Sequence, residues 1–368
     1  PSGLALSASS NSGSTADTLT SVTSPVITGS VAEAGTVVLY EGTTAVGTAT
    51  ASAPGAWTVT AASLADGAHS LTAKVTDTAG NTSTASSALT VTIDTSASAP
   101  TGLGLAVSSN SGSTSDTLTS VTSPVITGSV AEAGTVILYE GATALGTATV
   151  AAAGTWTIAA ASLADGAHTL SVTVTDTAGN TSSASSALTV TIDTSASAPT
   201  GLSLTTSSNS GSTADTLTSV TSPVITGSVA EAGTVVLYEG ATAVGTATAS
   251  APGTWTVTAA SLTDGAHTLS VTVTDTAGNT SSASSALTVT IDTSASAPTG
   301  LSLTTSSNSG STADTLTSVA APVITGSVAE AGTVVLYEGA TAVGTATASA
   351  PGAWTVTAAS LADGAHSL

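Results

Sequence analysis

Short runs of alternating apolar and polar residues recur throughout the chain, and no stretch has the period of an amphipathic helix. Residues 71–75 and 89–93, for example, place an apolar side chain at every second position. Such alternation predicts strands with one buried face. Turns rich in Gly, Asn, Pro and Ser separate the runs, so residues 1–94 are expected to form about seven short strands.

The whole pattern returns at a spacing of 99 residues, which is most visible in the tryptophans Trp57, Trp156, Trp255 and Trp354. A fixed spacing indicates tandem copies of one structural unit. The seam between copies is the recurring run Ile93–Pro100. We therefore predict domains at residues 1–94, 100–193, 199–292 and 298–368, joined by linkers at 95–99, 194–198 and 293–297. The fourth copy lacks a counterpart of residues 269–292, so the chain is expected to be a piece of a longer array.

The number of strands per unit and the turn spacing are typical of an immunoglobulin-like β-sandwich. The predicted fold is therefore all-β, with tandem sandwiches arranged as an extended array. The chain has no cysteine, so the inter-sheet disulfide of antibody domains is absent. Each core is expected to consist of Val, Leu, Ile and Ala around one Trp and one Tyr. Because Trp57 has the inward phase of Val59, it is predicted to be a core residue and not a sugar-binding platform.

The charge of the chain excludes several classes of partner. Twenty-two acidic residues stand against a single cationic side chain, Lys74, and the formal net charge is −21. Nucleic acids and anionic membranes both require clustered Lys and Arg, so neither is expected to be a partner. No apolar run approaches the roughly 20 residues that span a bilayer. The hydrophobic content of 41% is too high for a solvated disordered segment.

Counting strand directions predicts that the acidic residues collect where two domains meet. Each turn reverses the chain, so successive loops alternate between the two ends of a sandwich. The far end of the first domain then carries Asp17, Asp66 and Asp94, and it faces Glu132 and Asp176 of the next domain, beside Asn180. The predicted metal ligands at the three junctions are Asp17, Asp66, Asp94, Glu132, Asp176, Asp116, Asp165, Asp193, Glu231, Asp275, Asp215, Asp264, Asp292 and Glu330.

Carboxylates that gather without Lys or Arg repel one another, by about 1 kcal/mol per close pair in water and several times more when partly buried. A cation is therefore expected among them. Oxygen ligands with no Cys and one His per copy favour Ca²⁺ over Zn²⁺ or copper. No EF-hand spacing is present. The alternative is that the acidic residues only keep a long fibre coated with Ser and Thr in solution.

Three segments resemble the bacterial Ig-like repeats of giant biofilm-associated and RTX-type adhesins: VTVTDTAGNTSSASSALTVTID (Val172–Asp193), PVITGSVAEAGTVILYEG (Pro124–Gly141) and GTWTIAAASLADGAHTL (Gly154–Leu170). The resemblance covers the whole chain. It implies a stalk that carries a terminal binding region away from the cell, stiffened by calcium at the domain junctions and exported by type I secretion. The calcium ligands that it implies are Asp94, Asp193 and Asp292, then Asp77, Asp176 and Asp275, and then Asp17, Asp116, Asp215 and Asp314.

One departure from the family concerns a position where its members often have Asp and this chain has Asn. An amide oxygen still ligates calcium, but the missing charge weakens a site at that position. The residues are Asn11, Asn110, Asn209 and Asn308.

The function predicted from these features is that of a structural extender in a secreted bacterial surface adhesin, outside the cell, supporting adhesion and biofilm formation. Its partners would be neighbouring repeats of the same chain, and identical chains in a fibre or matrix. The alternative is that the repeats themselves self-associate or bind glycans as a sheath, matrix or surface-layer component, where near-identical copies would provide multivalency.

A hydrolase is not predicted, although every copy has Ser, His and Asp. The same set recurs in each repeat, and no nucleophile-elbow sequence accompanies it. His69 and its counterparts are instead expected to pack at a corner between a loop and a strand.

Overall fold

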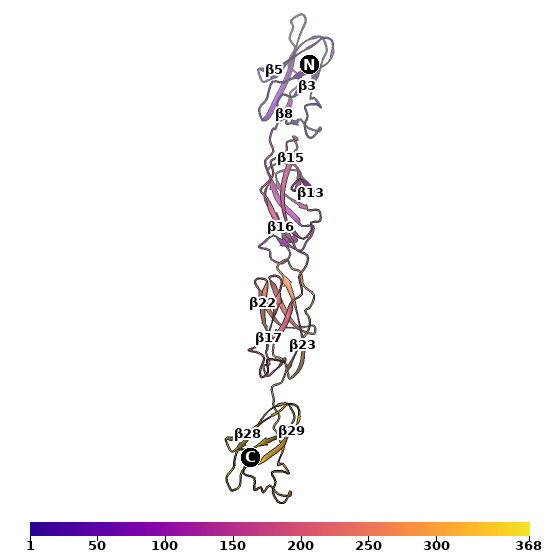
Figure 1. Cartoon of the computed structure of the whole chain (residues 1–368). Helices are drawn as coiled ribbons and strands as arrows, with labels where there is room; N and C mark the ends of the chain where they lie inside the picture. The colour runs from indigo at the N-terminus through magenta and orange to yellow at the C-terminus, as the bar shows by residue number, and fades with distance from the viewer.

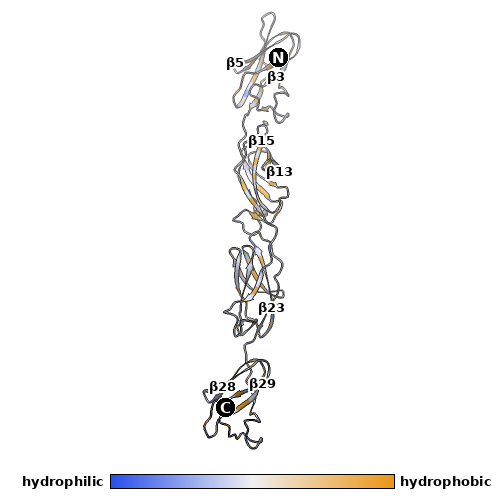
Figure 2. Ribbon diagram, in the orientation of Figure 1, coloured by the Kyte–Doolittle hydropathy of each residue, from blue (hydrophilic) through white to orange (hydrophobic).

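The alternating runs of the sequence form the strands of four β-sandwiches that follow one another along an elongated molecule (Figure 1). The structure is a computed structural model that describes residues 1–368. It confirms the prediction of an all-β chain of tandem sandwiches. Hydrophobic residues lie along the strands of each domain (Figure 2). The structure contains no helix with the length and hydropathy that a membrane span requires.

The first domain has two sheets that enclose one core. A three-stranded sheet has the order β1-β3-β6, and a five-stranded sheet has the order β2-β8-β7-β4-β5. All pairings are antiparallel except that of β2 with β8, which is parallel. The strands are β1 (Ser2–Leu6), β2 (Leu19–Thr20), β3 (Val26–Val31), β4 (Gly35–Glu41), β5 (Thr44–Ala51), β6 (Gly55–Thr60), β7 (Gly67–Asp77) and β8 (Leu89–Ile93).

The second and third domains repeat this topology. The second also has a short 3-10 helix, η1 (Val107–Ser109). Its strands are β9 (Thr101–Leu105), β10 (Leu118–Thr119), β11 (Val125–Val130), β12 (Gly134–Glu140), β13 (Thr143–Val150), β14 (Gly154–Ala159), β15 (Gly166–Asp176) and β16 (Leu188–Ile192). The third has β17 (Thr200–Leu204), β18 (Leu217–Thr218), β19 (Val224–Val229), β20 (Gly233–Glu239), β21 (Thr242–Ala249), β22 (Gly253–Thr258), β23 (Gly265–Asp275) and β24 (Leu287–Ile291).

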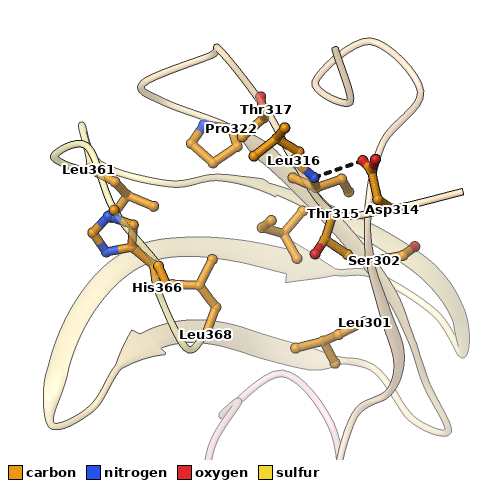
Figure 3. Close-up of a pocket in the computed structure, with 14 residues that line it drawn as sticks. Leu301, Ser302, Asp314, Thr315, Leu316, Thr317, Pro322, Leu361, His366 and Leu368 are labelled. Atoms are coloured by element: carbon orange, nitrogen blue, oxygen red, sulfur yellow. Dashed lines mark hydrogen bonds between the residues drawn. The ribbon is translucent and has the colours of Figure 1, made fainter. Parts of the chain in front are cut away.

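The fourth domain has a smaller core. Its sheets are β25-β26-β29 and β27-β28, and its core has 8 buried residues where the first domain has 15. A cavity of about 770 Å³ opens beside Leu301, Leu316 and Leu368, in the region that counterparts of β23 and β24 would cover (Figure 3). The strands are β25 (Thr299–Leu303), β26 (Val323–Val328), β27 (Gly332–Glu338), β28 (Thr341–Ala348) and β29 (Gly352–Thr357).

The short strand β2 ties a long polar loop to the end of the sandwich. The Thr20 side chain is fully buried, and its hydroxyl donates to the Ser10 carbonyl oxygen at 2.5 Å. The Asp94 amide donates to the Thr20 carbonyl oxygen at 2.9 Å. These bonds provide partners for the Ser10 carbonyl oxygen in the loop after β1 and for the Asp94 amide at the end of β8. They also fix the direction in which the chain leaves the domain at Asp94.

The tryptophan is a core residue, as predicted. Trp57 is 4% exposed and lies across from Gly29, its cross-strand partner on β3. The Tyr40 prediction was wrong, because Tyr40 is not part of the core cluster. It follows the inward-facing Leu39 on β4, so the strand alternation directs it to the opposite face. The Lys74 amine lies 5.6 Å from the centroid of the Tyr40 ring.

Substitution of Gly128 by alanine should destabilise the second domain. The added Cβ would lie 2.5 Å from Cζ2 of the Trp156 indole, so the ring must move within a packed core. We expect a cost of about 1–3 kcal/mol, as is usual for overpacking. In calorimetry one component of the melting curve should then shift downward, by about 4–8 °C for each kcal/mol.

The matched control is Gly104→Ala in the same domain. Gly104 lies in strand β9, and no atom lies within 4 Å of the place that its added methyl group would occupy. This change should alter stability by less than about 0.5 kcal/mol. Equal melting curves for the two variants would contradict the role assigned to Gly128.

Candidate metal sites at the domain junctions

Three carboxylates from two domains meet at each of the first two junctions. Asp94 follows the last strand of the first domain, whereas Glu132 lies in the turn before β12 and Asp176 ends β15 of the second. One carboxylate oxygen of each lies within 4.8 Å of the others. The counterparts Asp193, Glu231 and Asp275 meet in the same way. Strand-direction counting thus placed these residues at facing ends of neighbouring domains, and the structure brings them together.

The junction partly removes these carboxylates from solvent. Asp176 is 6% exposed and Asp275 is 7% exposed. Asp77, the equivalent residue at the outer end of the first domain, contacts no neighbouring domain and is more exposed. Three negative charges at this separation repel by about 1 kcal/mol per pair in water, and by about 4 kcal/mol at the effective dielectric constant of a protein surface. The only Lys or Arg of the chain, Lys74, lies over Tyr40 and not at a junction.

Hydrogen bonds hold the acidic side chains in place. Asp176 accepts the backbone amide of Asn180 at 2.8 Å and its side-chain amide at 2.8 Å. The same Asn180 side chain donates to the Asp94 carbonyl oxygen at 2.9 Å, across the junction. Glu132 Oε1 accepts the Ser98 amide of the linker at 3.0 Å. The linker is therefore bonded to the domain that follows it. Asp94 and Glu132 each have one carboxylate oxygen that accepts no hydrogen bond, whereas both oxygens of Asp176 accept one from Asn180.

The third junction has only two of these three carboxylates. Asp292 and Glu330 are both present, and Glu330 Oε1 accepts the Ser296 amide at 2.8 Å. The sequence ends before the counterpart of Asp275. The linker proline Pro298 is exposed here, whereas Pro100 and Pro199 are buried at the complete junctions. The third junction is therefore an internal reference for the other two.

The remaining predicted ligands lie outside the two groups of three. The Asp17 carboxylate accepts the Leu19 amide at 3.1 Å. The Asp66 carboxylate accepts the Thr95 hydroxyl at 2.9 and 3.0 Å, which fastens the start of the linker. The counterparts behave alike: Asp116, Asp215 and Asp314 accept an amide two residues on, and Asp165 and Asp264 accept the linker hydroxyls of Thr194 and Thr293.

Two of the contacts described here, the Ser98 amide with Glu132 and the Glu41 carboxylate with His69, could not be predicted from a sequence motif. Ser98 acts through its backbone amide, which every residue except proline possesses. The pairing of Glu41 with His69 joins residues 28 positions apart and depends on the register of β4 with β7. Asn180 was expected at this end of the domain, but its bond to the Asp94 carbonyl was not.

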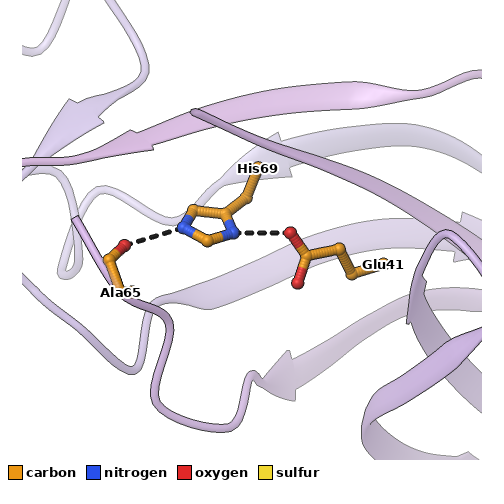
Figure 4. Close-up of polar contacts among 3 residues, drawn as sticks. All are labelled: Glu41, Ala65 and His69. Atoms are coloured by element: carbon orange, nitrogen blue, oxygen red, sulfur yellow. Dashed lines mark hydrogen bonds and ion pairs between the residues drawn. The ribbon is translucent and has the colours of Figure 1, made fainter. Parts of the chain in front are cut away.

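The histidine of each domain bridges a carboxylate and a carbonyl group (Figure 4). His69 Nδ1 lies 2.6 Å from Glu41 Oε1, and Nε2 lies 2.7 Å from the Ala65 carbonyl oxygen. Both partners are acceptors, so both nitrogens donate only when the ring is protonated. The Ala65 carbonyl raises the pKa of His69, burial opposes this, and Glu41 raises the pKa further. Neither ring nitrogen is left to act as a base toward serine.

The imidazolium bridge should make the domains more stable at acidic pH. The folded-state pKa lies above the ordinary value of 6.5, so this contribution is complete below pH 6.5 and is lost as the pH rises through the raised pKa. We expect the difference in melting temperature between the wild type and a variant with all four histidines changed to Gln to shrink over that range. NMR titration of the rings supplies the pKa directly. A constant difference, or ring pKa values at or below 6.5, would contradict the bridge.

Solved structures with a likeness to the chain have low similarity scores. The fibronectin(III)-like modules of Clostridium thermocellum CbhA give a TM-score of 0.29 at 16% identity, covering 51% of this chain and 93% of that one. The BSP domain of a biofilm associated protein gives 0.20 at 15% identity, covering 74% and 64%. The D0-D1 domain of Intimin gives 0.19 at 16% identity, covering 52% and 98%. No curated protein matches the chain.

The family is shown by sequence. The model of the bacterial Ig-like domain matches residues 1–95, 96–194, 195–293 and 294–368, which together span the chain. An Ig-like architecture of this kind is typically non-catalytic. The four sandwiches, the junctions between them and these matches lead to one conclusion: the chain belongs to the bacterial Ig-like domain family, as four tandem repeats.

Proposed function

We propose that this chain is an extender segment of a large bacterial surface adhesin, stiffened by calcium at its domain junctions. The observation that carries the proposal is the repeated group Asp94, Glu132 and Asp176, in which one ligand comes from one domain and two from the next. Family membership and the end-to-end arrangement of the sandwiches support a stalk (Figure 1). We further propose that the segment is extracellular, has no catalytic role and supports adhesion and biofilm formation.

The donor set fits calcium. It consists of carboxylate oxygens alone, whereas zinc and copper sites usually include nitrogen or sulfur ligands. Of the six carboxylates at the two junctions, those of Asp176 and Asp275 are buried, and no basic side chain neutralises them. Calcium takes 6–8 oxygen ligands and keeps water among them, so about three carboxylates complete a site of modest affinity. Asp94, Glu132 and Asp176 would hold the ion at the first junction, and Asp193, Glu231 and Asp275 at the second.

The mechanical effect follows from where the ligands lie. Bending the first junction moves Asp94, which is fixed to β8, away from Asp176, which is fixed to β15. A cation that binds both therefore resists bending. Without it, the mutual repulsion of the carboxylates favours opening. Extracellular modules with calcium affinities near millimolar would be empty in the cytosol and filled outside, so the array would stiffen on export.

Calcium titration of the full chain tests this function. Calorimetry should find two ions per chain, one for each group of three carboxylates. Small-angle scattering should show a longer maximum dimension in about millimolar calcium than in EDTA.

The double variant Asp94→Asn and Asp193→Asn should lose at least about tenfold in calcium affinity. Changing a residue that only hydrogen-bonds to a metal ligand costs about that much, and this variant changes a proposed ligand itself. Asp292→Asn is the matched control, because its junction lacks the third carboxylate, and it should leave both sites unchanged. Identical scattering and melting temperatures in EDTA and calcium would refute the proposal.

A further inference from the structure

A second contact joins the domains, made by the loop between β1 and β2. The Ser12 hydroxyl donates to the Ala178 carbonyl oxygen of the next domain at 2.5 Å. The Ser14 amide donates to the Thr177 carbonyl oxygen at 3.3 Å. At the second junction Ser111 and Ser113 make the same bonds to Ala277 and Thr276, at 2.5 and 3.4 Å. We call residues 12–14 and 111–113, with the backbone that they bind, the junction latch.

The latch brings two backbones together at glycine. Gly13 has a φ of +72°, in the left-handed region that favours glycine, and a Cβ at this position would overlap the Thr177 carbonyl oxygen. A Cβ at Gly179 on the facing turn would lie 3.1 Å from the Gly13 amide nitrogen. Gly112 and Gly278 face each other in the same way. The close approach of the two backbones therefore requires glycine, which has no side chain, on both surfaces.

The chain contains unoccupied copies of both surfaces. Gly211 has the same sequence context and a φ of +81°, and nothing lies within 4 Å of the place of its absent Cβ. The Ser219 amide still donates to Ser210 Oγ at 2.7 Å, as the Ser21 amide does to Ser12 Oγ. On the other surface, Ala178 is fully buried whereas Ala79 is exposed. The loop thus keeps the same Ser-to-Ser bond and the same positive φ with and without a facing turn, so it is preorganised for the contact.

The latch and the acidic group use different atoms of one turn of the following domain: the latch binds the carbonyl oxygens of Thr177 and Ala178, and Asp176 precedes them. A cavity of about 320 Å³ lies at the second junction, bounded by Gly112 and Ser113 of one domain and by Asp275 and Thr276 of the next. Open space therefore lies beside the bonds of Ser113 at this junction. A single point of attachment acts as a pivot, whereas two points restrict both bending and twisting.

We propose that the junction latch is a preformed receptor for the Thr-Ala-Gly turn of the following domain, and that it restrains each junction without a metal ion. No latch atom belongs to the acidic groups, and every latch bond is made to a backbone carbonyl. The latch therefore holds in the absence of calcium. The proposed cation would add a second restraint to a junction that is already oriented. This inference does not rest on the proposed function.

Distance measurements by pulsed electron resonance in EDTA test the latch. The chain has no cysteine, so spin labels can be placed at single introduced cysteines. The exposed residues Thr58 and Thr157 report on the first junction, and Thr256 and Thr355 report on the third, which has no facing turn. In otherwise wild-type chain we expect a narrower distance distribution for the first pair than for the third-junction pair. Equal widths would overturn the proposal.

The decisive variant is Gly13→Ala, which should broaden the Thr58–Thr157 distribution toward the width at the third junction. Its matched control is Gly211→Ala, which places Cβ at the same positive φ but meets no neighbour. A second pair of variants is Ser12→Ala, which removes a hydroxyl that bonds to a facing turn, and Ser210→Ala, which removes the equivalent hydroxyl where no facing turn is present. If Gly13→Ala and Gly211→Ala give the same width at the first junction, the latch does not exist. If the latch variants broaden the distribution but calcium has no effect on the wild type, only the proposed calcium function fails.

Discussion

The arrangement of this chain depends on one electrostatic constraint, which is that acidic groups meet where no basic group can neutralise them. The three carboxylates of a complete junction come from both domains, so their repulsion acts directly on the angle between the domains. Burial of Asp176 and Asp275 makes that repulsion stronger, because less water screens it. Separation of the domains or capture of a cation relieves it. On the function proposed above, the stiffness of the chain would depend on the ionic composition around it.

The fold translates this constraint into shape. The parallel pairing of β2 with β8 fixes the exit of the chain at Asp94, and Asp66 and Glu132 each bond to the linker that joins the first two domains. The linker therefore has few free rotations although its sequence is only Ser, Thr and Ala. The latch contributes on a different part of the same end. At the third junction the corresponding bonds of Asp264 and Glu330 to the linker are present as well, although the linker proline is exposed there.

Much of this could be predicted because strand alternation and chain reversal are geometric. Counting reversals placed Asp94, Glu132 and Asp176 together, since each lies at a strand end. It could not separate them from Asp17 and Asp66, whose side chains turn to nearby amide and hydroxyl groups within the same end. The latch had no signal in a chain with 36 glycines, because only the backbone of a distant turn makes Gly13 special. The prediction for Tyr40 was wrong because it rested on the aromatic residue type, whereas the alternation along β4 places this side chain on the outer face.

The two surfaces of the latch have a consequence for how such a chain changes over generations. Ser-Gly-Ser occurs at 12–14, 111–113, 210–212 and 309–311, and the facing Asp-Thr-Ala-Gly-Asn turn occurs at 77–81, 176–180 and 275–279. The Ser-Gly-Ser surface of any copy therefore fits the Asp-Thr-Ala-Gly-Asn turn of any other copy placed after it. Recombination between repeats can delete or duplicate whole units in register, and every new junction is formed from the same matched surfaces. The length of the molecule can thus vary in steps of one domain with no compensating mutation.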